Sequence, residues 1–172
     1  VINSKVQRPG VCNALETLLI NTEIYQDMGS QIIEELLEND VELFVDEKIK
    51  EDYPKLNLAN NLHYETEFLE LKLAVKVVQN DIEAIEHIRN YSSGHTEAIL
   101  TESKEVADNF AKSIDSSVIF INSSTRFTDG EMFGFGSEIG ISTQKLHVRG
   151  PMGLEALTNE RYVVTGEGTV RG

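Results

Sequence analysis

Cysteine, tryptophan and proline are scarce in this sequence of 172 residues, which contains one cysteine, no tryptophan and three prolines. A single cysteine excludes an internal disulfide bond. Four scattered histidines and that cysteine show no spacing typical of a metal site, so we expect no bound metal. Because the sequence lacks a signal-like segment and a long uncharged apolar run, we expect a cytoplasmic protein that does not enter a membrane.

Positive charge is limited as well, since 15 Lys and Arg face 29 Asp and Glu and leave a formal net charge of −14. Nucleic-acid binding depends on clustered Lys and Arg, so we exclude nucleic acid as a partner. The negative charge favours solubility instead. What the sequence does contain is 40% hydrophobic residues, enough for the core of one ordinary domain with an appendage.

Apolar runs with strand-like composition alternate with helix-like segments along the chain. We predict strands over residues 15–20, 41–45, 73–78, 98–100 and 118–121. Repeated strand-then-helix units predict an α/β fold with an open, largely parallel sheet that helices cover on both faces.

The helical segments are predicted from apolar residues that recur every three or four positions. The predicted buried faces are Met28, Ile32 and Leu36 with Ile33 and Leu37 beside them; Ile82, Ile85 and Ile88 behind a capping box of Asn80 and Glu83; and Val106, Ala107, Phe110 and Ala111. Ligands of such sheets bind at the carboxyl ends of the strands, so we expect the loop Asn122–Gly130 to line a site.

After Arg126 glycines cluster and helical periodicity disappears. We therefore predict an α/β domain at residues 1–125 and a glycine-rich connection with a C-terminal β extension at residues 126–172. Within the extension, Arg161–Arg171 contains two β-prone runs around a Gly-x-Gly turn, which predicts a hairpin or a bent edge strand. An unpaired strand edge invites a partner.

Cys12 lies at the end of a Pro-Gly loop, immediately before the first apolar run. A loop held against the end of a strand can aim a thiol into a cleft, where amide N–H groups and cations lower its pKa toward the reactive thiolate. A lone cysteine can equally be a small buried hydrophobic residue. Position alone leaves both interpretations open.

Three longer strings carry a family resemblance. Taken together they resemble the gamma-glutamyl phosphate reductases, also called glutamate-5-semialdehyde dehydrogenases, of the aldehyde dehydrogenase superfamily, and the resemblance runs over residues 1–172. The strings are Gln7–Ile20, Ser123–Gly130 and Ser142–Leu157.

The resemblance implies an oxidoreductase of amino-acid biosynthesis. Its reaction would be the NADPH-dependent reduction of L-glutamyl 5-phosphate to L-glutamate 5-semialdehyde and phosphate, a step in L-proline biosynthesis, through a thioester of the catalytic cysteine. The small-molecule substrate and NADPH/NADP are thus the expected ligands. The resemblance also implies that the C-terminal strands of residues 126–172 add to a neighbouring subunit, which predicts a homo-oligomer.

Members of this family carry a long N-terminal region with most of the NADP-binding domain. We therefore expect this sequence to be a C-terminal catalytic-domain fragment, with residues 1–125 as the catalytic domain, and we expect the fragment alone to be inactive. Gly134–Gly140 does not replace the missing region, because its third glycine comes one residue late for a dinucleotide fingerprint.

Other functions remain open at this point. The sequence also fits the reductase half of a bifunctional pyrroline-5-carboxylate synthase or another enzyme of the aldehyde dehydrogenase superfamily. A third alternative is an isolated fragment that acts only as a non-enzymatic assembly module.

The resemblance assigns Cys12 as the nucleophile. Asn13 is a plausible donor to the oxyanion beside the Cys12 N–H, although it can equally be a turn residue. Arg8 can lower the thiol pKa or bind an anionic substrate, or face the solvent. The hydroxyl-rich turn with Ser124 and Arg126 suits a phosphate or a carboxylate.

Glu67 resembles the glutamate of a Glu-x-Phe motif that bonds the nicotinamide ribose in aldehyde dehydrogenases. The pattern departs from theirs, because Phe68 follows Glu67 directly, so a surface carboxylate is the alternative. His95 resembles a family loop residue near the active site, but it can also be a capping or packed histidine. Lys145 and Arg149 are weaker candidates for anion binding, since their turn can equally be an interdomain joint.

Overall fold

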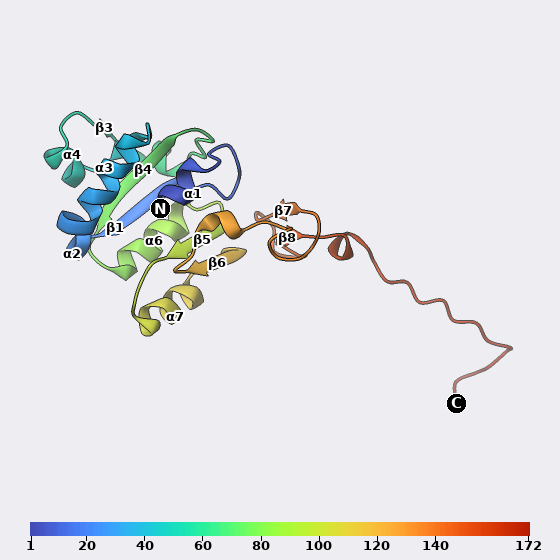
Figure 1. The fold of residues 1–172 in the computed structure, drawn as a ribbon. Helices are drawn as coiled ribbons and strands as arrows, with labels where there is room; N and C mark the ends of the chain where they lie inside the picture. The colour runs from blue at the N-terminus through green and yellow to red at the C-terminus, as the bar shows by residue number, and fades with distance from the viewer.

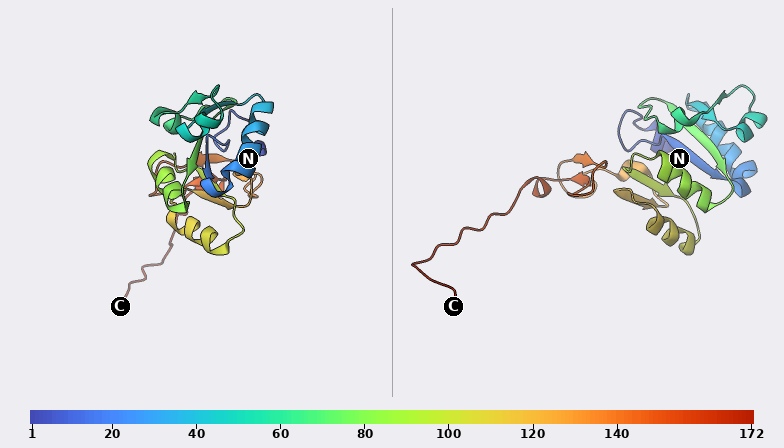
Figure 2. Two further views of the ribbon diagram at one scale, coloured as in Figure 1. Left: turned by 90° about the vertical axis from the view of Figure 1, so that its left-hand side faces the viewer. Right: turned by 180° about the vertical axis from the view of Figure 1, so that it is seen from behind.

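The computed structural model describes Val1 to Gly172. Figure 1 shows a body of helices and strands from which the C-terminal part of the chain extends away. The N-terminus lies in the body and the C-terminus lies at the far end of the extension, as the two other views in Figure 2 also show. The predicted α/β class is confirmed by this arrangement of parallel strands and helices.

The main sheet has four parallel strands in the order β1-β4-β2-β3. Its central strands coincide with the predicted runs, and β1 begins two residues later than predicted because the Leu15 N–H bonds to the Ser4 carbonyl at 2.9 Å. The strands are β1 (Thr17–Asn21), β2 (Glu42–Val45), β3 (Asn57–Leu58) and β4 (Lys72–Val78).

One face of this sheet holds the larger hydrophobic core. Alternate residues of a strand point to the same face, so Leu73, Val75 and Val77 of β4 lie together there. They pack against Ile33 and Leu36, which belong to the helical segment after β1. The short helices and turns around this sheet are α1 (Ile2–Val6), α3 (Ser30–Glu38), α4 (Glu47–Asp52) and α5 (Asn61–Glu65).

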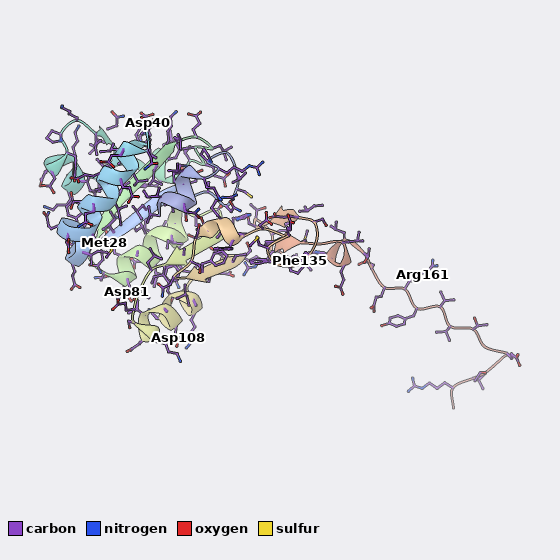
Figure 3. All side chains as sticks on the ribbon, viewed as in Figure 1. Met28, Asp40, Asp81, Asp108, Phe135 and Arg161 are labelled. Carbon is purple, nitrogen blue, oxygen red and sulfur yellow. The ribbon has the colours of Figure 1, made fainter.

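The helical segment after β1 differs from the prediction. It consists of α2 (Thr22–Ile24), a π-helical turn η1 (Tyr25–Gly29) and α3. A π-helical turn contains an extra residue, which rotates the following side chains relative to a regular α-helix. Tyr25, Ile33 and Leu36 are therefore buried, whereas Met28 is 56% exposed and lies on the outer side of the body (Figure 3).

Gly29 makes this rotation possible. A Cβ at Gly29 would lie 3.1 Å from side-chain atoms of both Ile20 and Tyr25, so the helix approaches β1 closely at this position. Leu37, which was predicted beside the buried face, is 37% exposed. The predicted face was therefore right for Ile33 and Leu36, which are buried, and wrong for Met28 and Leu37, which are exposed.

A second pair of parallel strands forms its own sheet, so the predicted single open sheet is divided in two. The pair is β5 (Thr96–Ile99) and β6 (Val118–Ile121), and α6 (Asp81–Tyr91) and α7 (Lys104–Ser113) pack together beside it. Their shared core contains Ile85, Phe110 and Ile114.

The start of α6 also differs from the prediction. The Asn80 side chain accepts a hydrogen bond from the Glu83 N–H at 3.0 Å, as a capping box requires, but the Glu83 carboxylate accepts from the N–H of Gln79 at 2.8 Å instead of from Asn80. Ile82 is 63% exposed, and the buried positions of α6 are Ile85 and His87. The cap and the buried face were therefore each predicted correctly in part, because Ile85 is buried and Ile88 packs against the same core whereas Ile82 is exposed.

The C-terminal region contains β7 (Ile139–Ile141) and β8 (Gly150–Met152), an antiparallel pair, and a short helical turn η3 (Glu155–Leu157). The hairpin predicted for Arg161–Arg171 is absent, and these residues run as extended chain without a partner strand (Figure 3). The segment lies away from the body, so its β-prone side chains have no apolar surface to cover.

The turn η2 (Thr125–Phe127) connects β6 to the C-terminal region. The division predicted between residues 125 and 126 falls inside this turn and stays a prediction. None of the helices has the length and the apolar composition needed to cross a bilayer.

Candidate active site

Cys12 lies in the turn between α1 and β1, and its side chain is exposed. The loop before β1 emerges on the side of the body from which the C-terminal region also emerges (Figures 1 and 2). The turn is closed by a hydrogen bond from the Ala14 N–H to the Val11 carbonyl at 3.0 Å. The thiol is therefore presented to the outside from a loop with fixed ends.

Three of the predicted site residues lie before the amino ends of strands, whereas Ser124 and Arg126 lie in the predicted loop that follows the carboxyl end of β6. Cys12 precedes β1, Glu67 precedes β4 and His95 precedes β5. The chain after β6 reaches them because it runs back: the hydroxyl of Thr128 lies 2.9 Å from the hydroxyl of Thr96, the first residue of β5.

Asn13 ties the cysteine loop to this returning segment. Its side chain is buried, and Nδ2 donates to the Thr128 carbonyl at 2.7 Å while Oδ1 accepts from the Arg126 guanidinium. Its backbone carbonyl accepts from the Thr125 hydroxyl at 2.7 Å. Since both ends of the amide are engaged, the contacts of Asn13 hold Cys12 in place, and its role as an oxyanion donor stays a prediction.

Arg126 is the cation that the fold brings to the cysteine loop. Besides Asn13, its guanidinium bonds Gln7, with Nε donating to Oε1 at 3.0 Å. Ser124 lies next to it but faces α1, donating to Asn3 Oδ1 at 2.7 Å and lying 2.9 Å from the Ser4 hydroxyl. Substrate binding by Ser124 and Arg126 stays a prediction, and both residues already fix the loop geometry.

The pKa of the Cys12 thiol is raised, contrary to the expectation that nearby groups lower it. The first cause is partial loss of water around the sulfur, and the second is the negative charge of Glu138, with a smaller effect from Glu67. The backbone N–H of Cys12 and the charge of Arg126 act in the opposite direction. The predicted cation, Arg8, is exposed, and the cation that acts on the thiol is Arg126.

Glu67 and His95 belong to the same surroundings. The negative charges of Glu138 and Glu67 raise the pKa of His95 as well as that of Cys12, although burial of His95 has the larger, opposite effect. Glu67 is exposed. His95 is buried, and burial is the main cause that lowers its pKa. Its Nδ1 lies 2.8 Å from the Thr96 hydroxyl, as expected for a packed histidine.

Lys145 and Arg149 do not join this group. Both pair with Asp115, which follows α7, and the Arg149 Nη2 atom lies 2.6 Å from Asp115 Oδ1. These pairs attach the loop between β7 and β8 to the body. No cluster of three or more potential metal ligands is present.

Comparison with known proteins finds similar sequences and similar structures. Over 171 residues the chain is 52% identical to the gamma-glutamyl phosphate reductase of Thermoanaerobacter sp., a match that covers 99% of the chain and 41% of that relative. The chain is thus similar to a segment of the gamma-glutamyl phosphate reductases. It spans 41% of the length of the curated relatives that it matches.

The crystal structure of the gamma-glutamyl phosphate reductase from Thermotoga maritima has the same fold over this segment, with a TM-score of 0.91, 50% identity, and coverage of 99% of this chain and 41% of that one. A propionaldehyde dehydrogenase from Clostridium phytofermentans matches with a TM-score of 0.64 at 13% identity, over 93% of this chain and 45% of that one. The fold of this chain is thus also found in an aldehyde dehydrogenase. No protein-family profile matches the chain.

Several residues around the candidate site could not be predicted from the sequence. Glu138 acts on the thiol from the C-terminal region, Thr128 accepts from Asn13, and Glu16 bonds the backbone beside Glu67. Each is distant in the sequence from the residue that it affects. No local pattern distinguishes them from surface or core residues.

Proposed function

We propose that the whole protein catalyses the NADPH-dependent reduction of L-glutamyl 5-phosphate to L-glutamate 5-semialdehyde and phosphate in L-proline biosynthesis. The observation that carries the proposal is an exposed cysteine in a loop fixed by Asn13 and Arg126, within a chain 52% identical to gamma-glutamyl phosphate reductases. A cytoplasmic location fits such an enzyme.

Cys12 acts as the nucleophile in this proposal. Its thiolate attacks the carbonyl carbon of the acyl phosphate, a carbon–sulfur bond forms, and the carbon–oxygen bond to phosphate breaks with the electron pair leaving on phosphate. NADPH, when bound, supplies the hydride that takes the thioester carbon to the aldehyde level. Release of the aldehyde from the sulfur then returns Cys12 for the next cycle.

The raised pKa of Cys12 adds a requirement to this chemistry. Most of the thiol is protonated near neutral pH, so the positive charge of Arg126 and the Cys12 N–H, which both favour the thiolate, are important for the attack. We assign Arg126 a role in binding an anionic group of the substrate, with Arg8 and Ser124 as additional candidates at the same loop. Asn13 and the Cys12 N–H are the candidate oxyanion donors.

The cofactor would contact this segment through Glu67. This residue fits a ribose-binding role because it is an exposed carboxylate whose charge reaches Cys12, and no ion pair engages it. A glutamate buried in the core could not reach a ligand. The rest of the cofactor contacts would come from other parts of a full-length reductase.

Oligomerisation through the C-terminal residues is part of the proposal. The extended segment carries exposed apolar side chains, including Tyr162 at 85% and Val164 at 92% exposure, with no partner strand in the chain. A second subunit would supply both an edge to pair with and a surface to cover these side chains.

The test uses a full-length reductase, meaning a chain of the relatives' length that contains these 172 residues. Cys12→Ser should lower kcat by several orders of magnitude while NADPH binding stays nearly unchanged, because a hydroxyl is far less ionised near neutral pH. Steady-state kinetics and a cofactor titration measure both quantities. Near-normal turnover of the variant would contradict the proposal.

A further inference from the structure

Lys5 is the one charged Lys, Arg, Asp or Glu side chain in the buried interior. Its side chain is 0% exposed, and its Nζ lies 3.0 Å from Glu16 Oε2. Lys5 belongs to α1, and Glu16 immediately precedes β1. The pair therefore spans the base of the loop that carries Cys12.

Glu16 also bonds the segment that carries Glu67. Its Oε2 accepts from the Phe68 N–H at 3.3 Å and its Oε1 accepts from the Leu69 N–H at 3.4 Å. Leu69 has a positive φ of 55°, a backbone conformation that side chains other than glycine rarely adopt. A carboxylate that holds two successive N–H groups favours such a turn, so Glu16 fixes the backbone immediately after Glu67.

Two further contacts fix the same turn. The Phe68 ring stacks on Phe44 of β2 with centroids 5.5 Å apart. On the other side, a Cβ at Gly10 would lie 3.5 Å from the Leu69 carbonyl oxygen, so the cysteine loop lies directly against the turn. The turn is thus held between the sheet and the loop of Cys12.

The pair is poorly suited to a stabilising role. Burial lowers the pKa of Lys5 and raises the pKa of Glu16, and their mutual hydrogen bond opposes both shifts without reversing them. Both directions mean that the folded state disfavours the charged forms. A buried ion pair of this kind can be replaced by uncharged side chains of similar volume with little loss of stability.

We propose that Lys5 and Glu16 are positioning residues: the pair holds the turn of Phe68 and Leu69 so that the Glu67 carboxylate stands beside Cys12, and it thereby sets the affinity for the nicotinamide cofactor. This inference rests on the proposed function, in which Glu67 contacts the cofactor ribose. Neither Lys5 nor Glu16 touches the reacting atoms in it.

The experiment compares matched variants of the full-length reductase. Lys5→Met/Glu16→Gln removes the buried pair and one of the two carboxylate acceptors at similar volume. Lys72→Met/Glu70→Gln is the control, because it removes a more exposed ion pair at the start of β4. In this pair the Lys72 Nζ atom lies 2.7 Å from Glu70 Oε2. Glu67→Gln is measured in parallel, because Glu67 is the residue proposed to contact the cofactor.

The buried-pair variant should raise the Kd and KM for NADPH roughly 3- to 10-fold, the size expected for a lost hydrogen bond. Its kcat, its rate of Cys12 alkylation and its melting temperature should stay close to wild type. The control should leave the NADPH Kd unchanged. A purely structural role would instead lower the melting temperature and leave the Kd of the folded fraction unchanged, which would overturn the inference.

Glu67→Gln separates the two possible failures. If it weakens NADPH binding and the buried-pair variant does not, the positioning inference is wrong while the proposed function stands. If Glu67→Gln leaves the Kd unchanged, the cofactor role of Glu67 is wrong and the inference falls with it. Where the double variant fails to fold, Glu16→Gln should show the same rise in Kd, and failure of both to fold would overturn the inference.

Discussion

Residues 1–128 bury or half-bury most of their apolar side chains within the chain, whereas residues 129–172 leave most of theirs in water. In the first region Leu36, Val45 and Val75 are 0% exposed. In the second, Leu146 is fully exposed and Val164 is 92% exposed. The first region therefore has its own core, while the second extends away from the body (Figure 1) and needs another surface to cover it.

The candidate active site draws on both regions despite this contrast. Cys12, Asn13 and Arg126 belong to the first region and are joined by hydrogen bonds. Glu138 belongs to the second, yet its charge is the strongest one that raises the thiol pKa. The C-terminal region thus contributes to the chemistry of the site as well as to the proposed assembly.

The contrast predicts a large difference in the effect of truncating apolar side chains. Leu36→Ala should lower the free energy of unfolding of the 172-residue chain by about 2–5 kcal/mol, because it leaves a cavity in the core. Val164→Ala should change it by less than about 0.5 kcal/mol, since the side chain is exposed. Urea denaturation measures both. Equal losses would show that residue 164 packs in the folded chain.

A second difference should appear on acidification. Burial lowers the pKa of His87, which packs against Tyr64 and Tyr91, to about 4 from an ordinary 6.5. Between these two values the unfolded chain takes up a proton that the folded chain does not, so stability falls as the pH drops from 6.5 to 4. The shift corresponds to a loss of up to about 3 kcal/mol.

His87→Phe should remove this part of the pH dependence while it keeps the aromatic contacts. His147→Gln, a change at an exposed histidine of the C-terminal region, is the control and should leave the pH dependence as it is. Denaturation curves at several pH values test the difference. An unchanged slope in the His87 variant would contradict the account.

The smallest predicted effect concerns the link between the two regions. Glu138→Gln should lower the pKa of Cys12, because it removes a negative charge that disfavours the thiolate. The rate of alkylation of Cys12 near neutral pH should rise accordingly. Glu155→Gln, at another exposed carboxylate of the C-terminal region, should leave the pH–rate profile unchanged. Identical pH–rate profiles for the two variants would contradict an effect of Glu138 on the Cys12 thiol.

The sequence predicted the strands where several apolar residues follow one another within a single element. The runs at 41–45, 73–78 and 118–121 became β2, β4 and β6 because short runs of apolar, β-branched and aromatic residues favour strands. In the helical segment after β1 the burial of Ile33 and Leu36 was predicted but the exposure of Met28 was not, since a π-helical turn leaves no signal in hydrophobic spacing.

The candidate site was predictable only in part for a related reason. Cys12 and Arg126 stand in distinctive strings, so the family resemblance identified both. Glu16 and Glu138 act through contacts with residues distant in the sequence, and such contacts become visible only in the fold. The hairpin predicted at the C-terminus did not form because pairing needs a surface outside the segment, which composition cannot reveal.

The central claim is that Cys12 carries the acyl group of the substrate. The most direct measurement incubates a full-length reductase with L-glutamyl 5-phosphate in the absence of NADPH and identifies the acylated peptide by mass spectrometry. The account predicts release of one phosphate per active site and a glutamyl thioester on the peptide that contains Cys12, both absent in Cys12→Ser. Acylation of another residue, or a phosphate release that Cys12→Ser retains, would contradict it.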